Sequence, residues 1–421
     1  MCVDVDGKVW YNNPIQQKGV SPLRIAGVIA EYNPFHNGHR YHVEAARAAG
    51  CDAVVAVMSG NFVQRGEPAA FDKWARTRMA LAGGVDAVFE LPQFYALQPA
   101  EWFACGGVRV LHGLGVDALA FGTEVDDLDT LRQQAALWRG ESPELQAAIR
   151  RALGEGKSHP RARYEAAAAQ GLPAEALLNP NAVLASMYLH WLSELCSPME
   201  PLPVRRVEAA YHDEDIAGAI ASATAVRRSL AAGDDRWRQA VPQAVASLID
   251  GLAAAGCGPV QADDLGQALL YALRTGAPLP DRAEGLDNRM RTAAMACGTA
   301  EEFYAAVKCR RYTLARIKRA AMLALLGVTA DDVALLRAEQ PVYARLLGYA
   351  RRVEWLVGEL GRRATIPFVA RPGSFRPEAG AMERLWLTDR RASDLYALAH
   401  RNPAGRQGGR DFTERMIVWE D

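Results

Sequence analysis

The chain has 421 residues, half of them apolar, and its 48 basic and 49 acidic side chains leave a formal net charge of −1. This length favours two domains. The near-neutral net charge argues against a protein that binds nucleic acid through an overall positive charge, so any contact with RNA has to come from a local basic patch. The seven cysteines are scattered and form no C-x-x-C pair, which argues against a zinc site or a disulfide framework and favours reduced thiols in a cytoplasmic protein. The sequence contains no run of eighteen apolar residues, so we expect no membrane-spanning helix.

The first 22 residues contain Asp4, Asp6 and Gly7 and have no apolar core segment. This composition argues against a signal peptide. We expect residues 1–22 to form an N-terminal extension ahead of the first strand.

Short apolar runs of strand type alternate with helical stretches over the next hundred residues. The expected strands are 25–30, 53–58, 87–91 and 118–121, and the expected helices are 38–49, 72–82 and 100–112. Buried strands that alternate with helices indicate a parallel sheet covered on both faces, so the expected fold class is α/β with a Rossmann-like domain. Ligands of such sheets bind at the carboxyl ends of the strands.

The turn after the first strand is the most informative segment, because residues 31–39 read Glu-Tyr-Asn-Pro-Phe-His-Asn-Gly-His. His36 and His39 lie at the entrance of the first helix, where free N–H groups and the positive end of the helix dipole suit a phosphate. Two imidazoles there can donate hydrogen bonds to phosphate oxygens as negative charge develops, and Gly38 lets a nucleotide approach the backbone. The alternative is an ordinary helix cap with solvated histidines. The H-x-G-H pattern resembles the signature of the nucleotidyltransferase superfamily that includes the class I aminoacyl-tRNA synthetases.

A second polar element reads Ser-Ala-Thr-Ala-Val-Arg over residues 222–227, after a mostly helical stretch at 126–200 and a possible strand at 203–207. Ser222 or Thr224 can cap a helix, and Arg227 then projects about one turn later toward the same place. Two hydroxyls and a guanidinium would form a second phosphate clamp, whereas the alternative is an ordinary cap with a solvated arginine. The element resembles the I-S-S-T-x-x-R motif of small adenylyltransferases.

After residue 233 the strand pattern mostly stops. This predicts a catalytic domain over 23–232 and a mainly α-helical C-terminal domain over 233–421, with a possible extended return at 416–419. The C-terminal domain has a basic segment with no acidic residue between Glu302 and Asp331, and its members are Lys308, Arg310, Arg311, Arg316, Lys318 and Arg319. Such a segment can bind RNA phosphates, or it can be an ordinary solvated face.

Several motifs together resemble the bacterial tRNA(Met) cytidine acetate ligases, over about residue 24 to the C-terminus. They are Glu31–His42, Met58–Pro68, Asp72–Thr77, Glu90–Pro92, Phe121–Glu124, Tyr211–Asp213, Glu284–Arg289, Arg311–Thr313 and Arg316–Arg319. The resemblance implies a nucleotidyltransferase-type fold and a ligase that activates acetate with ATP and transfers the acetyl group to N4 of the wobble cytidine of elongator tRNA(Met). The implied partners are ATP, acetate and this tRNA, with Mg²⁺ bridging the phosphates, and the C-terminal domain is the implied tRNA-binding part.

Carried over residue by residue, the resemblance implies that the catalytic residues are His36, His39, Ser222, Thr224 and Arg227. The implied ATP site consists of Ile29, Ala30, Glu31, Tyr32, Asn33, Pro34, Phe35, His36, Asn37, Gly38, His39, Arg40, Tyr41, His42, Gly122, Asn181 and Arg206. Two positions depart from the family pattern. Ala182 stands where the P-N-N segment has its second asparagine, and Arg205 stands where the K-R pair has lysine.

Two further groups of polar residues stay open at this point. The loop after the second strand could hold acetate or the acceptor cytosine, or it could be a plain turn, and its polar residues are Ser59, Asn61, Gln64 and Arg65. Lys73 and Arg76 could face phosphate or RNA, or they could lie on a solvated helix face.

Two other functions compete with the ligase. The first is a small-molecule adenylyltransferase, which shares the H-x-G-H chemistry but needs no large helical domain with a basic segment. The second is a non-catalytic RNA-binding protein with a relict nucleotide fold, and the intact residues His36, Gly38, His39 and Arg227 argue against it.

Overall fold

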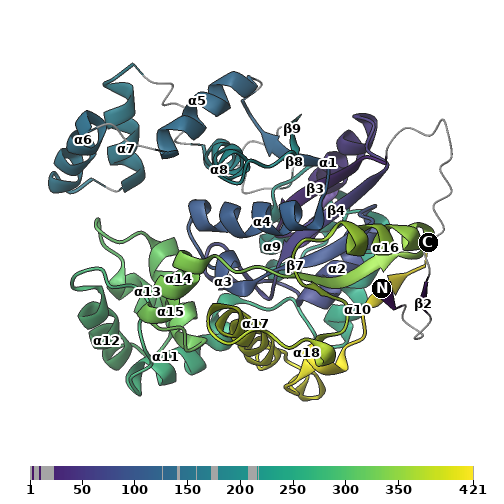
Figure 1. Cartoon of the computed structure of the whole chain (residues 1–421). Coiled ribbons are helices and arrows are strands. Elements are labelled where there is room, and N and C mark those ends of the chain that lie inside the picture. Colours follow the sequence, from purple (N-terminus) through teal and green to yellow (C-terminus); the bar gives the residue numbers. More distant parts are fainter. Residues whose placement is uncertain are drawn as a thin grey trace.

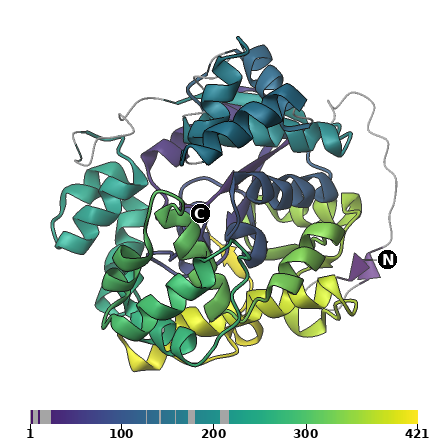
Figure 2. The same ribbon diagram turned by 90° about the vertical axis from the view of Figure 1, so that its left-hand side faces the viewer.

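The computed structural model describes residues 2–3, 9–10, 23–125, 127–139, 143–157, 159–171, 179–206, 216 and 218–420. A central sheet lies between two layers of helices (Figure 1). Helices α5 to α8 gather on one side of the molecule, and α11 to α15 gather on the opposite side, as the turned view also shows (Figure 2). Within these described ranges, no helix is long and apolar enough to cross a membrane.

Five parallel strands form the centre of the sheet. They are β3 (Ile25–Ala30), β4 (Ala53–Ser59), β7 (Ala87–Leu91), β8 (Ala118–Thr123) and β9 (Glu200–Arg205). Their order across the sheet is β7-β4-β3-β8-β9, so the chain starts in the middle and moves outward in both directions. This is the order of a Rossmann-like sheet, and it confirms the expected fold class. The carboxyl ends of β3 and β8 lie side by side where the direction of winding reverses.

Every residue of β4 is buried, because helices cover both faces of the sheet. Val55 and Val57 pack into one apolar core with α4 (Ala100–Leu114), α8 (Pro180–Glu194) and α16 (Glu354–Arg363). Val54, Ala56 and Met58 pack into the other core with α1 (Asn37–Ala48), α2 (Lys73–Ala82) and α10 (Gln243–Ala254). The continuous apolar run that predicted this strand therefore reflects burial on both sides.

The remaining helices belong to connections and to the C-terminal half. Between β7 and β9 these are α3 (Gln93–Ala96), α5 (Leu128–Arg139), α6 (Pro143–Gly154) and α7 (His159–Ala168). After β9 they are α9 (Ala223–Ala232), α11 (Gly266–Arg274), α12 (Leu286–Ala296), α13 (Ala300–Val307), α14 (Leu314–Leu325), α15 (Ala330–Glu339), α17 (Ala381–Ala397) and α18 (Arg410–Thr413). Helices α11 to α14 share a small apolar core of their own.

Two pairs of short strands lie outside the central sheet. β1 (Cys2–Val3) pairs with β2 (Val9–Trp10), and β5 (Phe62–Val63) pairs with β6 (Glu67–Pro68). Short 3₁₀ turns occupy Arg236–Ala240, Ala262–Leu265, Arg351–Val353, Pro372–Ser374 and Pro403–Gly405.

The C-terminal half also adds strands to the central sheet. β10 (Ala344–Ala350) pairs antiparallel with β7, and β11 (Phe368–Val369) and β12 (Ile417–Trp419) pair parallel with β10. The expected extended return at 416–419 is thus confirmed as β12, whereas β10 was not expected. Its sequence, Ala-Arg-Leu-Leu-Gly-Tyr-Ala, has no β-branched residue and resembles a helix by composition. The domain boundary at residue 233 stays a prediction.

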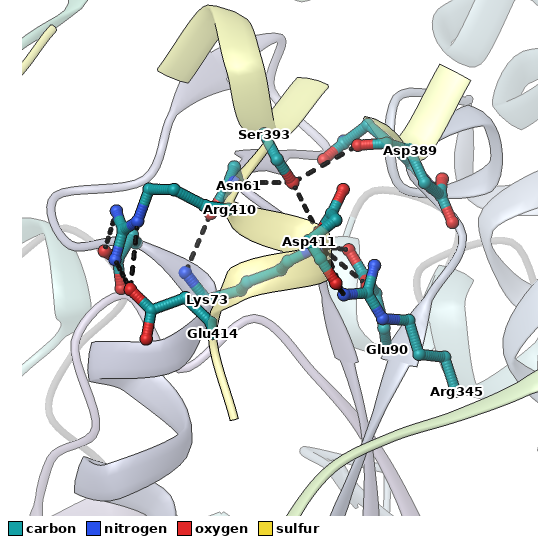
Figure 3. A network of polar contacts seen from close by, with 12 residues as sticks. Asn61, Lys73, Glu90, Arg345, Asp389, Ser393, Arg410, Asp411 and Glu414 are labelled. Carbon is teal, nitrogen blue, oxygen red and sulfur yellow. Dashed lines mark hydrogen bonds and ion pairs between the residues drawn. The ribbon is translucent and has the colours of Figure 1, made fainter. Parts of the chain in front are cut away.

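A cluster of buried charges joins the C-terminal half to the strand β7 (Figure 3). Lys73 Nζ lies 2.8 Å from Glu90 Oε1 and 2.7 Å from Asp411 Oδ1. Arg345 contacts the same two carboxylates at 3.1 and 2.8 Å. All four side chains are buried, so Lys73 faces neither phosphate nor solvent, and that expectation was wrong. The helix that Lys73 opens is covered by the C-terminal segment, which the local sequence could not reveal.

Candidate functional site

The two histidines of the H-x-G-H motif cap the first helix and stack on each other. His36 is the N-cap of α1, and its Nδ1 atom accepts a hydrogen bond from the Gly38 amide at 3.1 Å. The His39 Nδ1 atom accepts from the His36 amide at 3.2 Å, and the two ring centroids are 3.7 Å apart. Because both Nδ1 atoms accept, each neutral ring carries its proton on Nε2, which is left as a donor.

Both rings are held in their neutral form. Burial, and then the charges of Arg206 and Arg227, lower the pKa of His36 to about 3. Burial and the neighbouring His36 lower the pKa of His39 well below its usual value, and burial with Arg206 lowers that of His42 to about 4. Neutral Nε2–H groups at a helix N-terminus can donate to an anion without first binding a proton.

A cavity of about 770 Å³ opens in front of these rings, at the carboxyl ends of β3 and β8. Fifteen of the residues proposed from the sequence line it: Ile29, Ala30, Glu31, Tyr32, Asn33, His36, Gly38, His39, Tyr41, His42, Gly122, Asn181, Arg206, Ser222 and Thr224. Its lining also includes apolar side chains to which the sequence analysis gave no role, namely Phe103, Phe121, Leu184 and Tyr188. The volume suits a nucleotide, and the apolar wall suits a nucleobase.

Four residues of the 29–42 segment lie outside this lining. Pro34 and Phe35 are buried beneath it. Asn37 Nδ2 donates to the carbonyl oxygens of Ala219 and Gln239 at 2.7 and 3.0 Å. Arg40 is exposed and pairs with Glu44 one turn later. Asn37 thus fastens the loop to the segments that carry Ala219 and Gln239, and none of the four side chains lines the cavity.

The second motif meets the first one at the mouth of the cavity. Ser222 is the N-cap of α9, and its Oγ atom accepts from the Ala225 amide at 3.1 Å. Arg227 Nη1 donates to the carbonyl oxygen of Asn33 at 2.8 Å, and its Nη2 donates to Thr224 Oγ1 at 3.3 Å. Of the two expected caps, Ser222 and Thr224, Ser222 is the one that caps the helix. Arg227 lies outside the lining of the cavity and lines a smaller neighbouring pocket of about 210 Å³. The neighbouring motif Tyr211-His212-Asp213 lies outside the described residues.

A carboxylate that the sequence analysis left without a role ties together the edge formed by β8, α8 and β9. Glu124 Oε1 accepts from Asn181 Nδ2 at 2.6 Å and lies 3.2 Å from Arg206 Nε. A side chain at Gly122 would touch the stem of Arg206 at 3.4 Å. The motif Phe-Gly-Thr-Glu at 121–124 was the available signal, because its last residue orients two of the cavity's polar groups.

The loop after β4 is held from below by a buried guanidinium. Arg76 donates to the carbonyl oxygens of Glu31, Ser59 and Phe71 at 2.6, 3.0 and 2.8 Å, and also to that of Gly60. Arg76 therefore links the loop after β3 to the loop after β4, and the expectation that it faces phosphate, RNA or solvent was wrong. Burial lowers its pKa, but four carbonyl partners keep the charge satisfied.

The four polar residues of that loop divide into two pairs. Ser59 and Asn61 are buried, and Asn61 Oδ1 accepts from the Lys73 amide at 2.8 Å. Gln64 and Arg65 line the cavity. Only Gln64 and Arg65 are therefore placed to meet a ligand.

Helix α14 forms one wall of the cavity, so the C-terminal half takes part in the site. Ala315 and Arg319 line the cavity, and Arg319 Nη1 donates to the Gln64 carbonyl oxygen at 3.3 Å. Gly66 has a φ of +79°, and a side chain there would collide with the α14 backbone. Burial lowers the pKa of Arg319 to about 10, which still leaves it charged at neutral pH.

Two further cations of the expected basic segment have acidic partners from distant parts of the chain. Arg316 Nε lies 2.6 Å from Asp281 Oδ2, and Lys318 pairs with Glu67. The fold thus supplies two acids that the local sequence does not show, and the part that residues 316–319 play in RNA binding stays a prediction. Lys308 and Arg310, in the loop before α14, are exposed.

No metal site is apparent in the part of the chain that the structure describes: no three His, Cys, Asp or Glu side chains are grouped so as to hold an ion. Among the described residues that line the cavity, five arginines are present with a single carboxylate, that of Glu31. An ion such as Mg²⁺ would therefore have to be held largely by the phosphates of a nucleotide.

Comparisons with known proteins agree with this geometry. The model of the family described as HIGH Nucleotidyl Transferase matches residues 23–411. A tRNA(Met) cytidine acetate ligase of Acetivibrio thermocellus is 36% identical over 415 residues, covering 94% of this chain and 100% of the relative. One from Alkaliphilus metalliredigens is 35% identical, covering 92% of this chain and 97% of the relative.

Solved structures give the same result. The apo crystal structure of Thermotoga maritima TmcAL has a TM-score of 0.87 and 31% identity, and covers 95% of this chain and 100% of its own. The structure of the same protein bound with alpha-thio ATP has a TM-score of 0.86 and 30% identity, with the same coverage. The chain therefore belongs to the HIGH nucleotidyl transferase family and, within it, to the tRNA(Met) cytidine acetate ligases.

Proposed function

We propose that this protein activates acetate with ATP and transfers the acetyl group to N4 of the wobble cytidine of elongator tRNA(Met). The proposal rests on one observation: three separate parts of the chain meet at the same cavity. The H-x-G-H turn and the 222–227 element lie on two sides of it, and helix α14 of the C-terminal half forms a further wall. The names of the relatives supply the substrate, and the complex of the Thermotoga protein with an ATP analogue supports a nucleotide in this cavity.

In the first half-reaction, the carboxylate of acetate attacks the α-phosphorus of ATP, and pyrophosphate leaves. The Nε2–H donors of His36 and His39 and the side chains of Thr224 and Arg227 would stabilise the charge that develops on the phosphates. A bound magnesium ion would neutralise part of that charge. None of these side chains needs to become a covalent nucleophile, because their contribution is positioning and electrostatic stabilisation.

The apolar wall beside Gly122 would hold the adenine, while Asn181 and Arg206, oriented by Glu124, would bind the nucleotide's polar groups. This gives a role to the residues proposed from the sequence that line the cavity. Gln64 and Arg65 remain for acetate or for the acceptor base, because they lie on the side of the cavity nearest α14.

For the tRNA, we propose a contact surface around the loop between α13 and α14. Lys308, Arg310 and Arg311 are exposed there, and Arg311 has only a loose partner, with 3.4 Å between Nη2 and Glu284 Oε2. Exposed cations neutralise phosphates and release counterions, which gives affinity that depends on salt. This surface lies directly ahead of the helix that walls the cavity.

The proposal is tested by incubating elongator tRNA(Met) with ATP and ¹³C-labelled acetate and analysing the digested nucleosides by mass spectrometry. We expect N4-acetylcytidine with the label, and none without ATP. Formate and propionate in place of acetate measure the selectivity for the carboxylate. A dinucleotide formed from ATP and a phosphorylated metabolite, without modified tRNA, would instead support the small-molecule adenylyltransferase.

A further inference from the structure

Glu31 is an exception in its surroundings. It is the one carboxylate among the described residues that line the cavity, which also include five arginines: Arg65, Arg205, Arg206, Arg228 and Arg319. A cationic lining suits a triphosphate. A carboxylate beside a triphosphate opposes its binding, so a carboxylate kept there calls for a separate chemical role.

The chain holds Glu31 in one place by two contacts. Its Oε1 atom accepts from the Gln64 amide at 2.7 Å, and its own carbonyl oxygen accepts from Arg76 Nη1 at 2.6 Å. The residue directly follows β3, a strand in the middle of the sheet. A carboxylate fixed by a rigid strand end and by a neighbouring loop is preorganised to act on a bound group.

The charged and titratable groups that face Glu31 come from α2, α8 and α9. Burial lowers the pKa of Arg227, and the carboxylate of Glu31 opposes that shift. Burial, and then the Glu31 charge, raise the pKa of the Tyr188 phenol. Burial lowers the pKa of Arg76, and the Glu31 carboxylate is one of the groups that oppose this shift. Glu31 therefore lies between the second phosphate clamp and the loop that carries Gln64.

This position is also where the C-terminal half reaches the cavity. Gln64 connects Glu31 to α14, because its amide donates to Glu31 and its carbonyl accepts from Arg319. A base delivered from a tRNA held by the C-terminal half would enter along this wall. Glu31 is thus the carboxylate that such a base would meet beside the reacting end of the nucleotide.

We propose that Glu31 is the proton acceptor for the acceptor amine in the second half-reaction, an inference that rests on the proposed function. The cytosine N4 amine is a weak nucleophile, because its lone pair is delocalised into the ring. As N4 attacks the acetyl carbonyl, the new N–C bond forms, the bond between the carbonyl carbon and the phosphate oxygen breaks, and AMP leaves with that electron pair. The proton lost from N4 passes to a Glu31 carboxylate oxygen and then to solvent. General-base catalysis of this kind typically contributes about 100- to 10,000-fold.

The test compares two acceptors for the same acetyl-adenylate in the variant Glu31→Gln. Glutamine keeps an oxygen for the Gln64 amide but cannot take up a proton. We expect transfer to tRNA, measured in single-turnover experiments, to fall about 100- to 10,000-fold more than acetate-dependent ATP–pyrophosphate exchange does. Trapping with hydroxylamine, a strong nucleophile that needs no base, should fall no further than exchange does.

Two matched variants complete the experiment. Glu200→Gln removes an exposed carboxylate at the start of β9 and should change none of the three rates. Glu31→Asp keeps the charge but shortens the reach, so its transfer rate should lie between those of wild type and Glu31→Gln.

Equal losses of exchange, trapping and transfer in Glu31→Gln would overturn the proposal, because Glu31 would then act in nucleotide binding or in the first half-reaction. Transfer at the wild-type rate would also overturn it. A wild-type protein that forms no acetyl-hydroxamate would contradict the proposed function itself, and this outcome is read from a different arm of the experiment.

Discussion

Arg227 donates a hydrogen bond from Nη1 to the carbonyl oxygen of Asn33 at 2.8 Å, across 194 positions of sequence. This contact joins the loop after β3 to the helix α9, and so brings the two motifs that we expect to bind phosphate to one cavity mouth. The Nη1 atom of the guanidinium is therefore engaged in a contact within the protein, and Nη2 lies 3.3 Å from Thr224 Oγ1.

Replacing Arg227 should therefore affect chemistry more than RNA affinity. We expect Arg227→Ala to lower acetate-dependent adenylate formation about 100- to 1000-fold, the usual cost of losing one donor to transition-state charge. Arg227→Lys should retain part of the activity, because an ammonium keeps the charge but lacks the planar fork. Filter binding of tRNA should be nearly unchanged in both variants. A loss of tRNA affinity with normal adenylation would contradict the two-sided phosphate clamp.

Two substitutions of His39 can distinguish its structural role, accepting from the His36 amide, from its expected role as an Nε2–H donor to the phosphates. In His39→Asn, the short amide can still accept from the His36 amide, but no group reaches the Nε2 position. In His39→Gln, a longer amide can supply a donor near that position. We expect His39→Asn to fold with a melting temperature near that of wild type and to lose about 100- to 1000-fold in adenylation rate. His39→Gln should be more active than His39→Asn, and the reverse order of rates would remove the Nε2–H donor from the mechanism.

The lowered histidine pKa values predict how stability changes with pH. In the unfolded chain, these imidazoles titrate near pH 6.5, whereas the pKa is about 3 for His36 and about 4 for His42 in the fold. Between these values the unfolded state binds more protons, so their contribution to the free energy of unfolding is full above pH 6.5 and falls as the pH drops toward 3.

The variant His36→Asn, which keeps a good cap residue, should show a shallower fall in denaturant midpoint between pH 7 and pH 5 than wild type. Burial and then Glu90 raise the pKa of Asp389 to about 8, so this carboxyl favours the folded state at lower pH. Its effect is present in both proteins and does not change the difference between their slopes. Equal pH slopes in the two proteins would mean that His36 titrates normally.

The buried charges of Figure 3 predict opposite results for two similar substitutions. Asp411 balances both Lys73 and Arg345, which hold its pKa down against the effect of burial. Asp411→Asn should therefore destabilise the fold by about 3–5 kcal/mol, because it leaves two buried cations with the single carboxylate of Glu90 between them.

Asp389 is mostly uncharged at neutral pH, since its pKa is about 8. It accepts from the Gln93 amide at 2.6 Å and contacts the Tyr343 hydroxyl. Asp389→Asn can keep both contacts, so it should cost no more than about 1 kcal/mol. Urea unfolding of the two variants at pH 7 decides the matter, and equal losses would show that Asp389 is ionised like Asp411.

The tRNA surface can be tested with cations that differ in their partners. We expect the double change of Lys308 and Arg310 to Ala to reduce the slope of log affinity against log salt by about 1.4 to 1.8, at 0.7 to 0.9 per phosphate contact. Arg316→Ala is the matched control. Its guanidinium is already paired with Asp281 at 2.6 Å, so the salt slope should change little. An unchanged slope in the double variant would move the RNA surface elsewhere.

Much of the catalytic half was predictable because its signals are local. Alternation of apolar runs with helices located β3, β4, β7 and β8, and the polar turns at 31–39 and 222–227 marked the phosphate-binding motifs. The strand β10 was missed because pairing with β7, and not its own composition, makes it a strand. Local sequence also could not reveal that Lys73 and Arg76 are buried, or that Lys318 meets Glu67, because the contacts involved connect residues far apart in the chain.

The central claim is that this cavity forms acetyl-adenylate, and acetate-dependent ATP–pyrophosphate exchange in the absence of tRNA tests it most directly. We expect exchange of labelled pyrophosphate into ATP that requires acetate and that is reduced about 100-fold or more in Arg227→Ala. The absence of exchange with the wild-type protein, or exchange that proceeds equally well without any carboxylate, would contradict the account.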